Sequence, residues 1–218
     1  AVEVKENGLI TAQSGVLLSK LANIAAEHGL TGLEFASGIP GTLGGAVTMN
    51  AGAYDGEMKQ CLLRTRLLDE EGNILEYNTE QLQLGYRKSI LQTLPYVVLE
   101  ADIQLAFGDK EQIRQKMNTL NRQRREKQPL DKFSAGSTFK RPEGYFAGKL
   151  IADAGLKGYQ VGDAAVSEKH CGFIINKEHA TAREFLTVME DVARIVYEKF
   201  GVRLEPEVKM LGDFTRDE

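Results

Sequence analysis

A glycine-dense stretch over residues 32–56 constrains this chain more than any other feature, because it interrupts the hydrophobic periodicity that marks helices and strands. Its centre reads Gly38-Ile39-Pro40-Gly41-Thr42-Leu43-Gly44-Gly45-Ala46. Glycines allow backbone N–H groups to converge on an anion without obstruction by a Cβ atom, and the proline stiffens the loop. The spacing matches neither the dinucleotide fingerprint nor the P-loop, so neither a Rossmann nor a P-loop fold follows. On composition alone, phosphate binding and a tight structural turn explain the loop equally well.

The patterns around this stretch predict a mixed α+β fold. In the first half we expect a strand over residues 2–12 with a turn at Asn7-Gly8, a helix over 14–29, a hairpin over 64–77, a strand over 96–107 and a charged helix over 110–127. Pro129 ends that helix, and the boundary between two parts of the chain is predicted near it.

The second half contains the clearest helical pattern of the chain, over residues 181–200. Thr181 and Glu184 have the spacing of a capping box at its start, and Gly201 is placed to end it. Before this helix we expect a loop over residues 131–144, a short helix over 145–154 and two strand-like pieces within 164–176. A final strand is predicted over residues 202–211.

Composition limits the classes of protein to which the chain can belong. The 218 residues carry a net charge of −4, which gives no basic field for nucleic acid, and the apolar runs are too short to cross a bilayer. Cys61 and Cys171 stand alone, and neither they nor the histidines have metal-site spacing. Isolated cysteines are typical of a reducing compartment, and the first residues lack the pattern of a secretory signal. We therefore expect a cytoplasmic protein without a bound metal and without membrane insertion.

Three short polar motifs are each open to two interpretations. The first is Tyr86-Arg87-Lys88-Ser89, which read alone favours a solvated surface segment over a functional one. The second is Ser134-Ala135-Gly136-Ser137-Thr138-Phe139-Lys140, which suits close ligand approach or a simple turn, and which has no nearby base to make Ser137 a nucleophile. The third is Leu204-Glu205-Pro206-Glu207-Val208, in which Glu207 is either an exposed edge residue or a buried acid.

Taken together and in order, these motifs resemble those of the MurB family of flavoenzymes. The glycine loop with its continuation Met49-Asn50-Ala51-Gly52-Ala53-Tyr54 resembles the family's flavin-contacting loop, and the other three motifs resemble its active-site signatures. The resemblance runs from about residue 8 to residue 212. It implies FAD-dependent reduction of UDP-N-acetylglucosamine enolpyruvate to UDP-N-acetylmuramate, with NADPH as the hydride donor, in peptidoglycan precursor synthesis.

The resemblance also implies roles for individual residues. Ser137 matches the proton donor, and Arg87 and Glu207 match the residues that polarise and stabilise the enolate. Flavin binding is expected of one arginine and of residues in or near the glycine loop, namely Ile39, Pro40, Gly41, Thr42, Gly44, Gly45, Thr48, Gly52 and Arg124. Substrate binding is expected of Tyr54, Tyr86, Lys127, Arg141 and His170.

The sequence departs from the family pattern in four respects. Arg141 stands where the family often has Asn, and Asp55 replaces a usual glycine close to the glycine loop. The spacings between the motifs are short and resemble those of the compact subtype. The family also carries a first flavin lobe ahead of the position matched by Val2, so we expect this chain to be a truncated form.

The resemblance implies a fold of two parts. Residues 1–128, completed by 202–218, correspond to the second lobe of a two-lobed FAD-binding domain of the vanillyl-alcohol-oxidase type, and residues 129–201 to a small α+β substrate-binding domain. Two alternatives are kept. One is another FAD-dependent oxidoreductase of this fold, against which the Arg87 and Ser137 motifs argue. The other is a non-catalytic fragment that binds a nucleotide or flavin.

Overall fold

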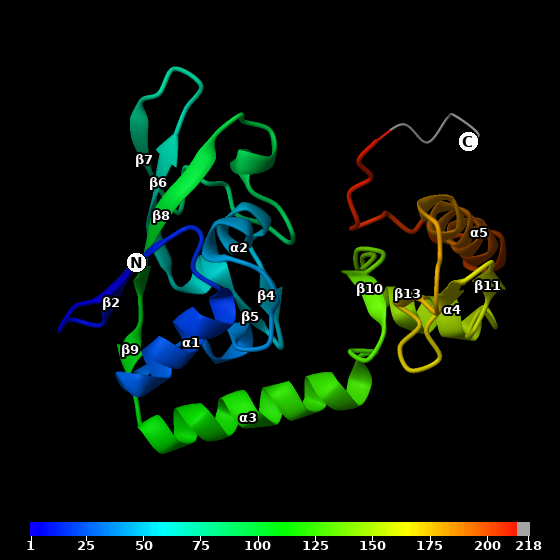
Figure 1. The fold of residues 1–218 in the computed structure, drawn as a ribbon, viewed down its shortest axis with the longest axis horizontal. Helices are drawn as coiled ribbons and strands as arrows, with labels where there is room; N and C mark the ends of the chain where they lie inside the picture. The colour runs from blue at the N-terminus through cyan, green and yellow to red at the C-terminus, as the bar shows by residue number, and fades with distance from the viewer. Residues whose placement is uncertain (213–218) are drawn as a thin grey trace. The chain divides into compact units, whose positions relative to one another are not determined.

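The structure is a computed structural model that describes residues 1–212, and it divides the chain into two compact units (Figure 1). The first unit is Ala1–Arg124, and the second begins at Arg125, close to the boundary predicted near Pro129. Helix α3 (Lys110–Lys127) ends the first unit and begins the second. Each unit has its own hydrophobic core, and each combines helices with an antiparallel sheet. The predicted α+β class is confirmed.

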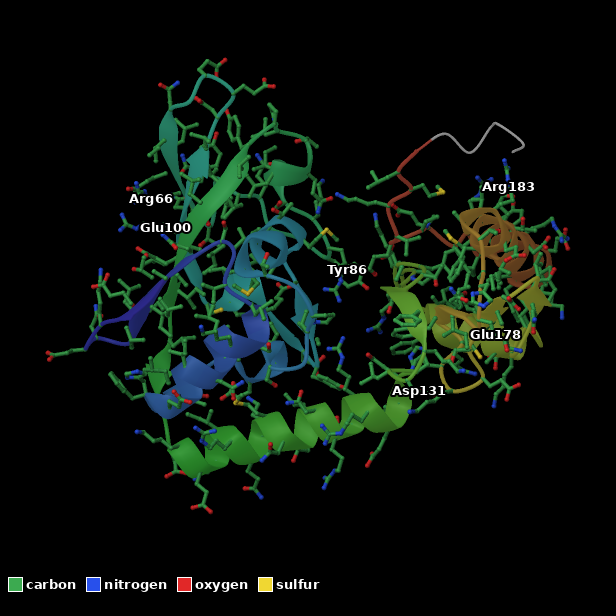
Figure 2. The ribbon with its side chains drawn as sticks, viewed as in Figure 1. Arg66, Tyr86, Glu100, Asp131, Glu178 and Arg183 are labelled. Atoms are coloured by element: carbon green, nitrogen blue, oxygen red, sulfur yellow. The ribbon has the colours of Figure 1, made fainter. Side chains whose placement is uncertain are left out.

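A five-stranded antiparallel sheet forms the centre of the first unit. In spatial order its strands are β1 (Val2–Val4), β2 (Leu9–Gln13), β8 (Val97–Gln104), β6 (Leu62–Leu68) and β7 (Ile74–Asn78). Across neighbouring strands, Arg66 Nη1 lies 2.8 Å from Glu100 Oε1 (Figure 2). The predicted hairpins over residues 2–12 and 64–77 are both confirmed.

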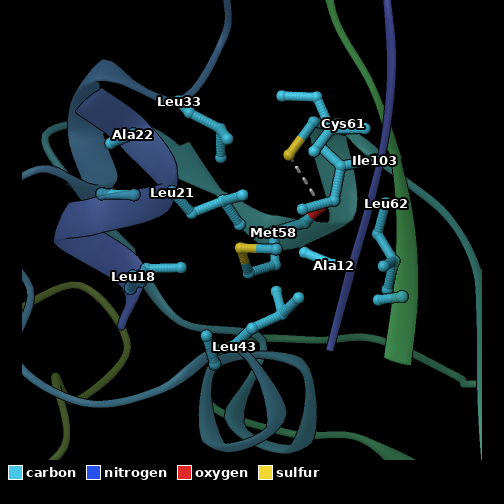
Figure 3. Packing of buried hydrophobic residues seen from close by; sticks show 14 of the residues in the cluster. Ala12, Leu18, Leu21, Ala22, Leu33, Leu43, Met58, Cys61, Leu62 and Ile103 are labelled. Atoms are coloured by element: carbon cyan, nitrogen blue, oxygen red, sulfur yellow. Dashed lines mark hydrogen bonds between the residues drawn. The ribbon is translucent and has the colours of Figure 1, made fainter. Parts of the chain in front are cut away.

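Two helices complete the core of the first unit, α1 (Leu18–Glu27) and α2 (Leu43–Met49). Leu18 and Leu21 of α1 meet Leu43 of α2 around Met58 and Ile103 (Figure 3). Each of these side chains is at most 1% exposed, and burying one contributes roughly 1.5–3 kcal/mol. This core fixes the beginning of α2, and therefore the end of the glycine loop.

Short elements connect the larger ones in the first unit. Two small antiparallel pairs are β3 (Leu30–Thr31) with β9 (Ala106–Phe107) and β4 (Gly52–Ala53) with β5 (Gly56–Glu57). Three single-turn 3₁₀ helices are Glu34–Ala36, Met58–Gln60 and Ile90–Gln92. The β4–β5 hairpin and the Ile90–Gln92 turn both lie beside the site described below.

The second unit contains a four-stranded antiparallel sheet and two helices of its own. In spatial order the strands are β10 (Phe133–Ser137), β13 (Phe173–Asn176), β12 (Ala164–Val166) and β11 (Gln160–Val161). The helices are α4 (Ala147–Asp153) and α5 (Ala182–Phe200). Val188, Val192 and Val196 follow the helical period of α5 and are fully buried in the second core.

The predicted ends of α5 are confirmed. Thr181 Oγ1 accepts a hydrogen bond from the Glu184 N–H at 3.2 Å, and Glu184 Oε2 accepts one from the Thr181 N–H at 2.9 Å. Gly201 ends the helix with φ +68°, a conformation that glycine adopts without steric cost. These contacts satisfy backbone groups that a helix leaves unpaired at its ends.

Two predictions around the glycine loop are wrong. The first helix begins at Leu18 rather than near residue 14, because the residues before it pair with the loop; Leu17 and Thr42 form an isolated bridge. Helix α2 was not predicted at all. Its sequence contains Gly44 and Gly45, which disfavour a helix, and burial of its apolar side chains holds it in place.

Two predictions in the second unit are also wrong. The expected loop over residues 131–144 contains strand β10, which exists through pairing with β13 rather than through its own composition. The expected strand over 202–211 is reduced to an isolated bridge between Phe139 and Pro206. Two backbone bonds of 2.8 Å flank this bridge, from the Lys140 N–H to the Glu205 carbonyl and from the Glu207 N–H to the Thr138 carbonyl. Val202, Leu204 and Val208 pack against the second core. The assignment of 202–218 to the first domain stays a prediction, and residues 213–218 lie outside the described range.

Candidate active site

The glycine loop is fixed on one side by residues that precede α1 and by helix α3. The Gly44 N–H donates to the Ser14 carbonyl at 2.9 Å. A Cβ atom added at Gly44 would lie 2.9 Å from the Cβ of Ser14, so glycine permits an approach that other residues would obstruct. At the start of the loop, a Cβ added at Gly38 would lie 2.5 Å from Oδ1 of Asn121. The loop therefore has one closely packed side.

The opposite side of the loop is open. Pro40, Gly41 and Gly45 are exposed, and a Cβ added at either glycine would meet no described atom closer than 4.0 Å. Thr42, the N-cap residue of α2, makes no side-chain capping bond within residues 1–212, while Ile39 beside it is half-buried. Backbone groups and small residues are thus accessible to a ligand here, as a diphosphate site requires.

Arg124 brings a positive charge to the same loop. It lies on α3, and a Cβ added at Gly38 would lie 3.2 Å from its Cδ atom. Burial lowers the pKa of the Arg124 guanidinium, and an electrostatic interaction with Tyr54 acts in the opposite direction. Because arginine stays protonated in proteins, Arg124 is a partly desolvated cation beside the loop.

Tyr54 and Asp55 form the turn of the β4–β5 hairpin. Both have positive φ, 52° and 64°, as a two-residue type I′ hairpin loop requires. This conformation is rare for a tyrosine, and strained backbone of this kind concentrates at functional sites. Gly52 opens the hairpin, and a Cβ there would lie 2.5 Å from the Gly56 carbonyl oxygen. Thr48, in the last turn of α2, donates its hydroxyl to the Gly44 carbonyl.

Tyr86 and Arg87 form a second strained turn. Gly85 and Lys88 exchange backbone hydrogen bonds of 3.0 and 3.1 Å on either side, and Arg87 has φ 52°. The Arg87 Nη2 atom donates to the Gly52 carbonyl at 2.8 Å, and its guanidinium carbon lies 5.1 Å from the centroid of the exposed Tyr86 ring (Figure 2). The bond to Gly52 thus joins the turn that carries Tyr86 and Arg87 to the hairpin that carries Tyr54.

In the second unit, Ser137 lies at an irregular position of β10. The register against β13 shifts between Ser134 and Ser137, and Gly136 within this bulge has φ +86°. A bulge bends the strand and re-aims the side chains beside it, which is common next to active sites. The Ser137 side chain is exposed.

Backbone pairing brings Glu207 beside Thr138, the residue after Ser137, although the two segments are far apart in sequence. The Glu207 N–H donates to the carbonyl of Thr138 at 2.8 Å, and the bridge between Phe139 and Pro206 continues the pairing. Glu207 is half-buried. The structure therefore brings together two of the three expected catalytic residues within the second unit, and Arg87 belongs to the first.

Arg141 and Lys127 supply cations in the second unit. The Arg141 guanidinium carbon lies 3.9 Å from the centroid of the Phe146 ring, and its Nε donates to the Tyr145 carbonyl at 3.2 Å. Lys127 is exposed at the C-terminal end of α3. Arg141 is therefore held by its neighbours, whereas Lys127 extends into solvent.

His170 is fixed by its own loop. Its Nδ1 accepts a hydrogen bond from the Gly172 N–H at 3.1 Å, and burial lowers the pKa of the imidazole. The neutral ring therefore carries its proton on Nε2. A Cβ added at Gly148 would lie 3.1 Å from the imidazole Cε1, so this glycine makes room for the ring.

No three His, Cys, Asp or Glu side chains of residues 1–212 are placed to hold a metal ion. Within the same range, no helix combines the length and apolar character needed to cross a bilayer.

Known proteins match this chain along almost its full length. Residues 1–78 match the family described as "FAD binding domain", and residues 128–211 match "UDP-N-acetylenolpyruvoylglucosamine reductase, C-terminal domain". A UDP-N-acetylenolpyruvoylglucosamine reductase from Lachnoclostridium phytofermentans is 57% identical over 211 residues, which make up 97% of this chain and 68% of that protein. The chain belongs to the MurB family.

Further members agree with this assignment. A UDP-N-acetylenolpyruvoylglucosamine reductase from Caldanaerobacter subterraneus subsp. tengcongensis is 55% identical, over 96% of this chain and 70% of its own length. The crystal structure of MurB from Thermus caldophilus has a TM-score of 0.80 at 39% identity, over 94% of this chain and 73% of that one. The expected resemblance and the expected fold, an FAD-binding domain with a MurB-type C-terminal domain, are both confirmed.

Two residues to which the sequence assigned no individual role lie among the expected site residues of the first unit. Asn50 is fully buried between the two strained turns, and Gln92 bonds to the carbonyl of Arg87. Asn often ends a helix in the left-handed conformation, but the sequence did not predict α2, so no C-cap signal pointed to Asn50. Gln92 carries no signal either, because its contacts depend on a turn that the sequence does not reveal.

Proposed function

We propose that this chain carries the flavin and substrate surfaces of a UDP-N-acetylmuramate dehydrogenase, which reduces UDP-N-acetylglucosamine enolpyruvate with NADPH in peptidoglycan precursor synthesis. The observation that carries the proposal is the ordered match to both family domains at 57% identity to a relative with this activity in its name. We further propose a cytoplasmic location, which two free, buried cysteines support.

The first unit fits FAD by the chemistry of its donors. The glycine loop offers an open side where a Cβ atom would otherwise stand, and Arg124 adds a partly desolvated cation beside it. These are the elements that hold a diphosphate. Residues 39–45, Thr48, Gly52 and Arg124 would hold the cofactor. When bound, FAD supplies the redox chemistry by carrying reducing equivalents from NADPH to the enolpyruvyl double bond.

Ser137 is proposed to donate a proton to C2 of the enolate that forms from the substrate. A serine hydroxyl is a weak acid in water, but it suffices against a carbanion-like centre when a fixed cation stabilises the developing charge. Its exposure after a bulge supports this role, because the hydroxyl is accessible to a ligand. The resulting alkoxide recovers its proton from solvent.

Arg87 and Glu207 are proposed to stabilise the enolate. Arg87 cannot lose its proton, so it acts by charge and by donating hydrogen bonds. Glu207 is held half-buried beside the strand that carries Ser137, which supports a role in the same step. Substrate binding is assigned to Tyr54, Tyr86, Lys127, Arg141 and His170, with the two cations of the second unit directed to the UDP diphosphate.

The test measures NADPH oxidation by the FAD-loaded enzyme with and without UDP-N-acetylglucosamine enolpyruvate. We expect the substrate to stimulate oxidation and UDP-N-acetylmuramate to appear in equal amount by mass spectrometry. Oxidation without stimulation would favour another FAD-dependent oxidoreductase of this fold. A protein that binds flavin or nucleotide without any turnover would favour a binding fragment.

A further inference from the structure

Positive φ angles outside glycine are confined to one region of the described chain. Within residues 1–212 they occur only at Asn50, Tyr54, Asp55, Gln83 and Arg87. Tyr54 and Asp55 form one turn, and Arg87 lies in the other. A non-glycine residue with positive φ is strained, and it keeps this conformation only where surrounding contacts hold it in place. The hydrogen bonds that hold these two turns therefore indicate which residues control the position of Arg87.

Asn50 connects the two turns. It ends α2 in the left-handed conformation, with φ 42° and ψ 56°, and its side chain is 0% exposed. Its Nδ2 donates to the Gly85 carbonyl at 2.9 Å and to Glu57 Oε2 at 3.0 Å, while its Oδ1 accepts from the Lys59 N–H at 2.9 Å. Gly85 precedes the second turn, and Glu57 and Lys59 follow the first. A single buried amide thus bonds to both.

The residues that follow the second turn bond to the C-terminal end of α2. The Nε2 atom of Gln92 donates to the carbonyls of Arg87 at 3.0 Å and Thr48 at 3.1 Å. The Ser89 hydroxyl donates to the Thr48 carbonyl at 2.6 Å. Thr48 lies in the last turn of α2, so the turn that carries Arg87 is attached to this helix end on both flanks.

We propose that Asn50 is a positioning residue, which sets the Arg87 turn against the Tyr54 hairpin so that the guanidinium reaches the Gly52 carbonyl. The significance of this position rests on the role proposed above for Arg87. A helix cap alone would not need the amide, because glycine ends helices in the same conformation without steric cost. The amide bonds to two acceptors and one donor that belong to separate turns, and without it these groups lose the bonds that tie one turn to the other.

The first test is independent of catalysis and uses backbone hydrogen exchange in Asn50→Gly. Glycine keeps the left-handed backbone and removes only the side chain. We expect exchange of the amides in residues 85–92 to accelerate by about fivefold or more, because a bond that closes this turn is lost. The matched control is Asn73→Gly, which removes an Asn side chain bonded to Asp69 in the β6–β7 turn and should leave residues 85–92 unchanged.

The second test asks whether Asn50 acts through Arg87. In the FAD-loaded enzyme, Asn50→Gly should slow reoxidation of reduced flavin by the enolpyruvyl substrate about tenfold, and should change flavin reduction by NADPH less. In an Arg87→Ala background, the same substitution should change reoxidation less than about twofold, because the group that it positions is already absent. A general loss of structure would instead persist in both backgrounds.

Either of two results would overturn the proposal: unchanged exchange in residues 85–92, or an Asn50→Gly effect of equal size with and without Arg87. If the unmodified enzyme shows no substrate-stimulated turnover, the proposed function fails, and hydrogen exchange alone decides whether Asn50 holds the turn. If Asn50→Gly does not fold, Asn50→Asp takes its place. That variant keeps the side-chain shape and replaces the donor amide with an oxygen facing Glu57.

Discussion

An irregularity in the backbone sets the position of the exposed Ser137 side chain. Ser137 follows Gly136 at a bulge, and the next residue bonds to Glu207. In an FAD-loaded enzyme of the relatives' full length, we expect Ser137→Ala to leave flavin reduction by NADPH nearly unchanged, because that step needs no hydroxyl here. Reoxidation by the enolpyruvyl substrate should slow by ~10²–10⁴, the usual loss for a positioned acid. Stopped-flow absorbance of the flavin separates the two steps.

Two further variants make this prediction specific. Ser137→Cys should retain more activity than Ser137→Ala, because a thiol also donates a proton. Ser134→Ala makes the same change on the same strand, at a residue that is also exposed. It removes only a long 3.4 Å bond from the Gly136 N–H, so it should change both steps little. Equal slowing of reduction and reoxidation in Ser137→Ala would show that the serine is structural or positions the flavin.

Lys127 tests the diphosphate assignment. Lysine meets phosphate as a point charge, so in an enzyme of the relatives' full length Lys127→Ala should weaken ground-state binding, raising KM for the UDP substrate about tenfold with little change in kcat. Lys110→Ala removes the same charge from the other end of the same exposed helix and serves as the control. Steady-state kinetics at two salt concentrations would measure both, and a KM unchanged in Lys127→Ala would remove this lysine from the substrate site.

At the scale of elements, the start of α5 depends on a glycine outside the helix. Gly162 has φ +54°, and a Cβ added there would lie 1.8 Å from Glu184 Oε1, the capping-box carboxylate. Gly162→Ala should therefore displace that carboxylate and strain the backbone, which together cost roughly 1–3 kcal/mol of unfolding free energy. Urea unfolding followed by circular dichroism measures the loss.

Two comparisons separate the causes of this loss. Gly158→Ala places alanine at φ +74°, where the nearest atom is a Glu168 oxygen 3.3 Å away, so it reports the backbone strain without loss of the cap. In a Glu184→Ala background, Gly162→Ala should cost only that strain. If its cost stays the same with and without the Glu184 carboxylate, the proposed coupling between this glycine and the cap is wrong.

The accuracy of sequence prediction differed among elements for physical reasons. Helices α3 and α5 and the β6–β7 hairpin were predicted because their periodicity, caps and turns are local signals. Helix α2 and strand β10 were missed because both are rich in small residues and are held by tertiary contacts. The strand predicted over residues 202–211 had suitable alternation, but its pairing is reduced to one bridge, and Val202, Leu204 and Val208 pack against the second core instead.

The expected site residues also divide into those that local sequence patterns indicate and those that tertiary contacts place. The glycine loop and the Ser137 motif could be singled out from composition, and the family resemblance supplied their roles. The pairing that places Glu207 beside Thr138 joins distant segments, so no local pattern indicates it. The positive φ angles of Tyr54 and Arg87 also run against residue preference, which sequence reasoning follows by construction. Such departures from local preference are expected at functional sites.

At the scale of the whole molecule, the chain presents its expected functional residues on two units. Arg87, Tyr54 and the glycine loop belong to the first, and Ser137 and Glu207 belong to the second. Each unit forms its own core, so each can hold its own expected functional residues in place without the other. A substrate that reaches residues of both would make catalysis depend on their relative placement, whereas flavin binding depends on the first unit and on whatever completes it.

The last prediction concerns flavin binding by the 218 residues alone. They span 68% of the length of the Lachnoclostridium relative, and the glycine loop with Arg124 is proposed to form one side of a diphosphate site. One side of a site must immobilise the ligand without contacts from the opposite side. The affinity then lacks most of the contribution that a preorganised site makes. We therefore expect this polypeptide to bind FAD weakly, at least ~100-fold less tightly than a protein with the relative's full length, in a titration followed by flavin fluorescence. Circular dichroism must show both to be folded. Tight, stoichiometric binding by the 218 residues would mean that the glycine loop and Arg124 suffice for the cofactor.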